Sequence, residues 1–327
     1  MNEMQKIQEL EAIQLQVARA STIADLGAIK RKLGSNGKAL EFKVGLVGWA
    51  WIIVFMVNLS LIIFNMMNRQ PVPLYAIVLF AISAVFVWAV LYCRKVRPNP
   101  TQLLNEVEFK ACCLKNGVQR IQDTSSIESF LYEEFSEFNR GNYSRGFTEI
   151  YQGTYSSEGK AKPYYVYFFN WTDRHEHTET TTDSDGFSRD ETHEYFKTYY
   201  RNGIVFPVTT PATNIWQRRA LERAGRFQVA SSLFNTCYNV SGLSEHQLSR
   251  FLKPAVVEMI LAFTGSLLHL AYESNGKGGL LISTTSNPLM RQETVNTSQA
   301  LFSQEMPLLK AAIEHAKKLE FQLAVYN

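Results

Sequence analysis

Two long uncharged segments constrain this chain more than any other feature of its sequence. Residues 44–67 and 72–93 contain no charged side chain in 24 and 22 positions. An α-helix rises about 1.5 Å per residue, so either segment is long enough to cross a hydrocarbon core of about 30 Å. The link between them, Asn68-Arg69-Gln70-Pro71, is short enough to place two helices antiparallel as neighbours. The sequence therefore predicts a two-helix transmembrane hairpin.

Basic residues near the ends of these segments predict the orientation of the hairpin. In membrane proteins, lysine and arginine are enriched in the segments that stay in the cytoplasm. The turn contains one basic residue, Arg69, whereas eight flank the outer ends: Lys30, Arg31, Lys32, Lys38, Lys43, Arg94, Lys95 and Arg97. We therefore expect a multi-pass membrane protein with both termini cytoplasmic and the lipid bilayer as its surroundings.

Two asparagines in the first uncharged segment, Asn58 and Asn65, predict self-association in the membrane. An amide that faces lipid needs a hydrogen-bond partner, and a second hairpin would supply one. The amino-terminal residues 3–33 form an amphipathic helix, with a break expected at Gly34-Ser35-Asn36-Gly37. We expect its apolar stripe to pack either on its own domain or on a second copy. Together with the two asparagines, the second alternative predicts a homo-oligomer. The stripe consists of Met4, Ile7, Leu10, Ile13 and Val17.

The rest of the chain has the pattern of an α+β domain with an antiparallel sheet. We therefore divide the chain into a cytoplasmic helical arm (1–43), the transmembrane hairpin (44–93) and a cytoplasmic α+β domain (94–327). Capping, glycine and proline signals predict helices at 101–114, 125–138, 213–225, 244–263 and 298–323. Aromatic and β-branched runs predict paired strands at 148–155 with 163–171, 194–200 with 203–208, and 267–272 with 279–284.

The order of these parts resembles a bacterial family known only as domain of unknown function 3137. The likeness lies in the stretch from Thr178 to Phe196, similar to a Thr/Asp/Gly/His hairpin that leads into an aromatic strand. It lies also in Leu221-Glu222, Phe227, Phe234 and Tyr238 before an apolar helix. The resemblance implies a protein of the bacterial inner membrane. Members are often encoded near LemA-type membrane proteins, which implies such a protein as a partner.

Three histidines, His175, His177 and His193, make the best candidate metal site in the sequence. His175 and His177 would point to the same face of a strand, and imidazole with carboxylate binds divalent metals. The alternative is a solvated hairpin tip, because Thr, Asp, Ser and Gly are typical of loops. The carboxylates nearby are Asp173, Glu176, Glu179, Asp183, Asp185, Asp190, Glu191 and Glu194.

A second candidate site is a basic cluster near Trp216. Four arginines on or directly after the predicted helix 213–225 could dock on anionic lipid at about 1 kcal/mol per basic residue. The alternative is an ordinary solvated helix face, since Glu222 lies at helical spacing from two of them. The arginines are Arg218, Arg219, Arg223 and Arg226.

The function expected from these features is a binding or scaffold module tethered to the envelope membrane. The alternative is a metal-dependent enzyme that uses the His-rich hairpin 172–194, although the sequence contains no recognisable catalytic triad, nucleophile pair or phosphate-binding loop. A formal net charge of +3 does not favour nucleic acid as a partner. No cofactor is expected apart from the divalent metal of the alternative.

Overall fold

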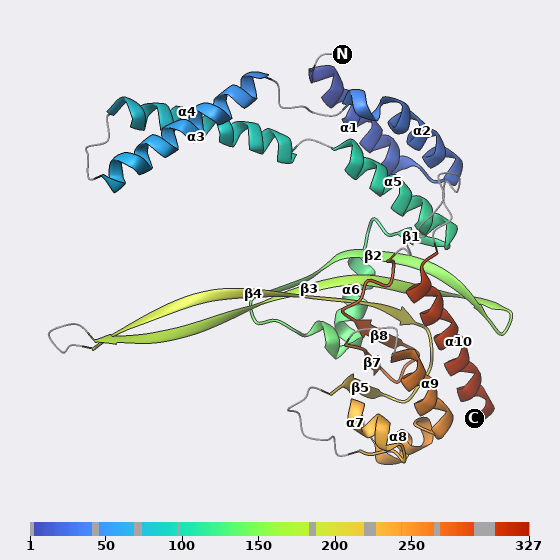
Figure 1. Cartoon of the computed structure of the whole chain (residues 1–327). Coiled ribbons are helices and arrows are strands. Elements are labelled where there is room, and N and C mark those ends of the chain that lie inside the picture. Colours follow the sequence, from blue (N-terminus) through green and yellow to red (C-terminus); the bar gives the residue numbers. More distant parts are fainter. Residues whose placement is uncertain are drawn as a thin grey trace. The chain divides into compact units, whose positions relative to one another are not determined.

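The chain forms two compact units, Met1–Ala111 and Cys112–Asn327. The computed structural model describes residues 3–40, 46–68, 74–96, 99–182, 188–218, 227–242, 244–264, 269–290 and 305–326 (Figure 1). The boundary between the units falls inside a helix, α5 (Pro100–Lys115). The predicted arm and hairpin thus belong to one unit.

The amino-terminal arm is two helices, α1 (Glu3–Arg19) and α2 (Ile23–Leu40), where the sequence predicted one. Thr22 and Asp25 start the second helix with a reciprocal capping box. The Asp25 backbone N–H donates to Thr22 Oγ1 at 3.1 Å, and the Thr22 N–H donates to Asp25 Oδ2 at 3.2 Å. The break expected at Gly34 is wrong, because α2 continues to Leu40.

The apolar stripe of α1 packs inside its own unit. Leu10, Ile13 and Val17 are fully buried, as is Leu26 of α2. The Lys110 ammonium of α5 donates at 2.7 Å to the carbonyls of Val17 and Ala18, which satisfies the open end of α1. Salt bridges Lys30–Glu108 and Lys32–Glu9 tie the same helices together.

The uncharged segments form the predicted antiparallel pair, α3 (Leu46–Met67) and α4 (Leu74–Val96). Phe55 stacks on Phe80 with ring centroids 5.0 Å apart. Asn58 is buried and its Nδ2 donates to Val54 O at 2.8 Å. Asn65 is half-buried. Many large apolar side chains of both helices are exposed, including Phe64 and Trp88.

The transmembrane assignment of 44–67 and 72–93 is corrected by the structure. Across the described ranges, no helix combines the length and the apolar character needed to cross a membrane. The finding contradicts the predicted transmembrane hairpin, the inner-membrane location and the cytoplasmic placement of both termini that followed from it.

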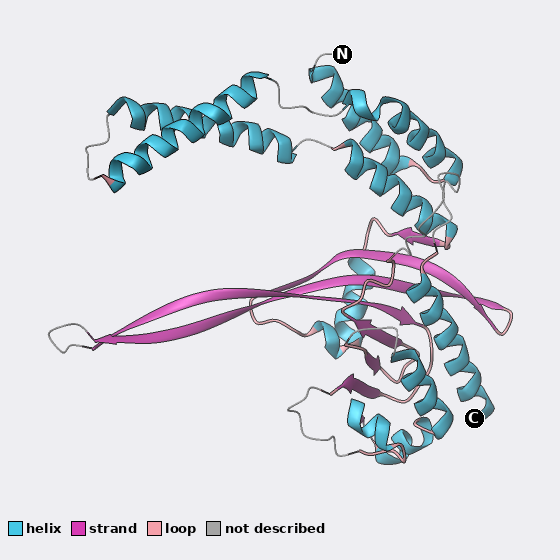
Figure 2. Ribbon diagram, in the orientation of Figure 1, coloured by secondary structure: helices cyan, strands magenta, loops and turns pink. Residues whose placement is uncertain are grey.

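The second unit is built on one eight-stranded antiparallel sheet in the order β1-β2-β3-β4-β8-β7-β5-β6 (Figure 2). The sheet confirms the predicted α+β class of this part of the chain. Its strands are β1 (Val118–Arg120), β2 (Ser144–Ser157), β3 (Lys160–Thr182), β4 (Ser188–Phe206), β5 (Thr213–Gln217), β6 (Tyr238–Gly242), β7 (Ala271–Ser274) and β8 (Leu280–Thr284).

Helices cover both faces of this sheet. On the face formed by the odd-numbered residues of β3 lie α6 (Ser125–Glu134) and the 3-10 turn η1 (Ser136–Phe138). On the even face lie α9 (Pro254–Thr264) and α10 (Pro307–Tyr326). The remaining helices are α7 (Ser232–Cys237) and α8 (Glu245–Phe251). Proline stands at the first position of α9 and α10, where its missing N–H costs nothing.

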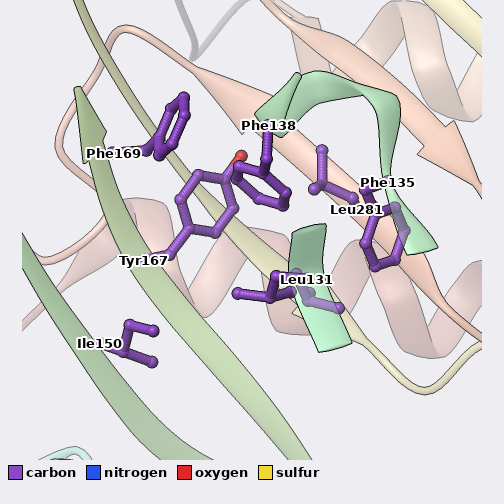
Figure 3. Close-up of a cluster of buried hydrophobic side chains, with 8 residues drawn as sticks. Leu131, Phe135, Phe138, Ile150, Tyr167, Phe169 and Leu281 are labelled. Carbon is purple, nitrogen blue, oxygen red and sulfur yellow. The ribbon is translucent and has the colours of Figure 1, made fainter. Parts of the chain in front are cut away.

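The core of the odd face is a cluster of rings around Phe138 (Figure 3). Its ring meets Tyr167 edge-on at 4.9 Å and Phe169 at 5.2 Å, and Phe135 lies at 6.4 Å. Such pairs contribute about 0.5–1.5 kcal/mol each beyond burial. The Glu273 carboxylate of β7 accepts the backbone N–H groups of Ser136 and Glu137, which holds η1 against the sheet.

The core of the even face contains a buried histidine, His315 of α10. Its Nε2 lies 3.1 Å from the Tyr272 hydroxyl, and Phe263 of α9 stacks on its ring at 4.5 Å. Burial, aided by Lys318, lowers the pKa of His315 from 6.5 to about 4. The ring is therefore neutral in the folded protein at neutral pH.

Two further sequence predictions are wrong. The helix predicted to begin at Thr213 does not begin there, because residues 213–217 form β5 between β6 and β7. The turn expected at Arg201-Asn202 is absent, because β4 runs unbroken from Ser188 to Phe206. By contrast, α5, α8, α9 and the β7–β8 hairpin confirm the predictions for those segments.

Gly203 of β4 is the first test of this packing. A Cβ there would overlap the Ile282 carbonyl and the Tyr167 hydroxyl. Gly203→Ala should therefore lower the free energy of unfolding by about 1–3 kcal/mol in urea titrations. Gly146→Ala in β2 is the matched control, since nothing lies within 4 Å of its added Cβ. Equal stability of both variants would contradict the described packing.

His315 gives a second test, through pH. Its folded pKa is depressed, so the unfolded chain binds the proton more readily between pH 6.5 and 4. The stability contributed by neutral His315 is thus present above pH 6.5 and is lost as the pH falls toward 4. Between pH 6 and 5 the wild type should lose about 1 kcal/mol more than His315→Gln. His246→Gln, at an exposed site, should keep the wild-type slope.

Candidate functional site

The most distinctive surface of the second unit is a two-stranded ribbon formed by the end of β3 and the start of β4. The last residue of β3 that β2 pairs is Thr172, opposite Ser144. Beyond it, Asp173–Thr182 pair with Ser188–Lys197 alone, in ten cross-strand pairs. Figures 1 and 2 show this ribbon extending well past the other strands. We call these twenty residues the ribbon arm.

An asparagine anchors the base of the ribbon arm. The side-chain amide of Asn142 acts as a substitute peptide group: its Nδ2 donates to Arg174 O at 3.0 Å, and its Oδ1 accepts the Arg174 N–H at 2.7 Å. The Asn142 backbone N–H also donates to Asp173 Oδ1 at 3.2 Å. These bonds extend the pairing of the β3 edge past the end of β2. A ribbon of two strands is marginal alone, so this anchor supports the arm.

One face of the arm continues the odd face of the core. Trp171 stacks on Tyr199 at 5.3 Å, and Phe169 stacks on Trp171 at 6.0 Å. Farther out, His175 stacks on its cross-strand neighbour Tyr195 at 4.9 Å. Lys197 lies over the Tyr199 ring at 5.2 Å. A row of rings thus runs from the buried core onto the exposed arm.

A buried ion-pair network supports the base of this row. Glu137 is only 6% exposed, and its carboxylate accepts from Arg140 at 2.6 Å and Arg201 at 3.0 Å. Arg140 also lies over the Trp171 ring at 5.3 Å. The pairing neutralises the buried carboxylate, so we assign this network a structural role.

The other face of the arm is held by polar cross-strand contacts. Arg174 pairs with Glu176 at 3.2 Å and with Glu194 across the ribbon. Thr180 donates to Asp190 at 2.7 Å. At the base of this face Phe196 lies 4.7 Å from Tyr143. The side chains of Tyr143, Phe196 and Tyr200, together with Tyr195 on the first face, are 51–67% exposed.

The charge of the arm is strongly negative. Residues 173–197, which include the tip, contain eight acidic and three basic side chains, whereas the whole chain has a formal charge of +3. Residues 1–111 contain twelve basic and seven acidic side chains. Opposite charges are thus concentrated in different parts of the chain.

The structure brings two of the three predicted metal ligands together. His175 and His177 lie on one face of β3, as predicted, and His177 pairs directly with His193 across the ribbon. In the described part of the chain, no group of three or more His, Cys, Asp or Glu is placed to hold a metal ion. Asp183 and Asp185 lie outside the described residues.

The predicted basic helix does not begin at Thr213, where the structure has β5 instead. Arg218 follows β5 and donates its guanidinium to the carbonyls of Asn235, at 2.5 Å, and Thr236, at 3.3 Å. These bonds fix the end of α7. Arg219, Arg223 and Arg226 lie outside the described residues, so the proposed lipid contact stays a prediction.

The sequence did not reveal the exposed rings of the arm as a site. From the sequence, residues 172–194 are either a metal-binding hairpin or a solvated hairpin tip rich in Thr, Asp, Ser and Gly. The available signal was an alternation of period two that continues from Trp171 through the histidines.

A cavity near the even-face core is too small to be a ligand site. It has a volume of about 10 Å³ and is lined by Thr210, Thr213, Tyr272, Ser274 and neighbouring apolar side chains. That volume corresponds to about one water molecule, whereas ligand pockets occupy about 300–1,000 Å³.

Comparisons with protein-family models, with curated proteins and with solved structures find no match to this chain. The resemblance to the bacterial family of unknown function and the LemA-type partner that it implies therefore stay expectations.

Asn142 allows a test of how the arm is anchored. Asn142→Ala removes both side-chain bonds to Arg174, each worth about 1 kcal/mol, and should speed hydrogen exchange of the Arg174 amide about tenfold or more. Exchange of the buried Tyr167 amide should not change. Asn139→Ala, at an exposed position three residues earlier, is the control. Unchanged exchange at Arg174 would contradict the anchoring role.

Proposed function

We propose that this protein is a self-associating binding module whose ribbon arm docks on a second copy of the chain. The observation that carries the proposal is the arm itself: ten cross-strand pairs that extend past β2 and present exposed rings and carboxylates. A projecting ribbon with this surface adds nothing to the core of its own unit. Large exposed aromatic groups with a charged rim are typical of protein interfaces.

The charge of the arm favours a basic protein surface as its partner. Nucleic acid and anionic lipid would be repelled by eight carboxylates against three cations. The chain's own helical residues 1–111 carry the opposite charge, with exposed Arg19 and Arg31 among them. A second copy is therefore a complementary partner, and such head-to-tail contact forms rings or chains of molecules. A LemA-type protein is the other protein partner expected.

A metal-dependent enzyme remains the second candidate from the sequence. Catalytic metal sites use three protein ligands and leave an open coordination position for substrate. The described side chains form no assembled group of three ligands, and the cavity near the even-face core is too small for a substrate. These observations favour the binding module.

Charge reversal on the arm tests the proposal. Full-length protein in a non-ionic detergent, which covers the exposed apolar side chains of α3 and α4, would be studied by sedimentation velocity at low and high salt. Glu176→Lys with Asp190→Lys should weaken self-association about tenfold, or about 1.4 kcal/mol, at low salt. Glu314→Lys on α10 makes the same type of charge change away from the arm and should leave association unchanged.

A mixing experiment identifies the docking partner. Arg19→Glu with Arg31→Glu should weaken self-association as the arm variant does. An equal mixture of the two double variants should associate again, because each contributes one intact surface to a head-to-tail contact. Wild-type protein that stays monomeric at all concentrations, or a mixture that fails to recover, would overturn docking on a second copy.

A further inference from the structure

We propose that His177 and His193 form a cross-strand zinc-binding site on the ribbon arm. The two residues are directly opposite in the β3–β4 register, so their side chains leave the same face of the ribbon. Both side chains are exposed. The proposal extends the proposed function, on which its role in docking rests, but metal binding by the pair does not require a partner.

The spacing of the pair suits a shared metal ion. Side chains directly opposite each other on an antiparallel ribbon have Cβ atoms about 4.5–5.5 Å apart, which brings two imidazoles within reach of one ion. Zinc binds neutral imidazole nitrogen at about 2.0–2.1 Å. Directly paired histidines are thus held by the backbone at a chelating distance, without a loop that must be ordered first.

A neighbouring carboxylate is the third ligand. Glu179 lies two residues after His177 on the same strand and therefore on the same face, and its Oε1 is 3.5 Å from His177 Nε2. The described side chains do not form a preassembled group of three. Rotation of the exposed Glu179 side chain completes the set, and water supplies the fourth position of a tetrahedral site.

His175 takes a different role from the pair. It lies on the same face, one step nearer the core, and its ring stacks on Tyr195. We assign it to the row of rings and leave it out of the ligand set. This assignment separates the three histidines that the sequence grouped together.

The consequence of zinc binding is a fixed register in the outer half of the arm. A ribbon of two strands is marginal in water, and a metal that links both strands removes conformations of the open state. Zinc would therefore order the surface that the arm presents to its partner.

Zinc titration of untagged full-length protein tests the site. Isothermal titration at pH 7.5 should show one zinc ion per chain, with affinity lowered at least tenfold by His177→Ala and by His193→Ala. His246→Ala, at an exposed histidine of α8, is the matched control and should bind as the wild type does. His175→Ala should also keep the affinity, because His175 is outside the proposed ligand set.

Hydrogen exchange gives a readout that does not depend on affinity. Zinc should slow exchange of the Thr178 and Thr192 amides in the wild type and leave it unchanged in His177→Ala. Equal zinc binding by the wild type and by the double variant His177→Ala/His193→Ala would overturn the site. If the wild type binds zinc but arm charge reversal leaves assembly unchanged, docking is overturned and the zinc site stands. If charge reversal weakens assembly but the wild type binds no zinc, the zinc site is overturned and docking stands.

Discussion

The packing of strand β3 against helices on both of its faces is the constraint on which the second unit depends. Its odd residues Tyr167 and Phe169 are enclosed by Phe138, and its even residues Tyr164 and Val166 are fully buried on the opposite face. A strand buried on both faces cannot slip by one residue without exchanging two sets of large side chains. β3 therefore fixes the register of β2 and β4, its two neighbours in the sheet.

The same register determines what the ribbon arm presents to solvent. Because side chains alternate strictly, the face that holds Phe169 in the core holds Trp171, His175 and His177 farther out. The core thus orients the arm, although few of the arm's residues contact it. Gly203 of β4 belongs to this core, since its missing Cβ leaves room for the Tyr167 hydroxyl of β3.

The sequence predicted the elements whose signals are local. The Ser244 cap of α8 accepts the Gln247 N–H, and the turn at Asn275–Gly279 uses glycines with positive φ at 276 and 278. It failed where the deciding contact is distant. Asn202-Gly203 has the composition of a turn, but the glycine serves the approach of Tyr167, and Arg201 pairs with Glu137 sixty-four residues earlier. β5 likewise depends on its position between β6 and β7.

For the candidate site, composition and register carried different information. Composition revealed the histidines and the carboxylates but not their arrangement, because three histidines within nineteen residues could lie on either face of either strand. The register resolves them: His177 opposes His193, whereas His175 opposes Tyr195. A cross-strand pair depends on the register of the two strands, in which residues whose numbers add to 370 face each other. A shift of that register by one residue would separate the two imidazoles, so the β3–β4 register links the sequence of the arm to its chemistry.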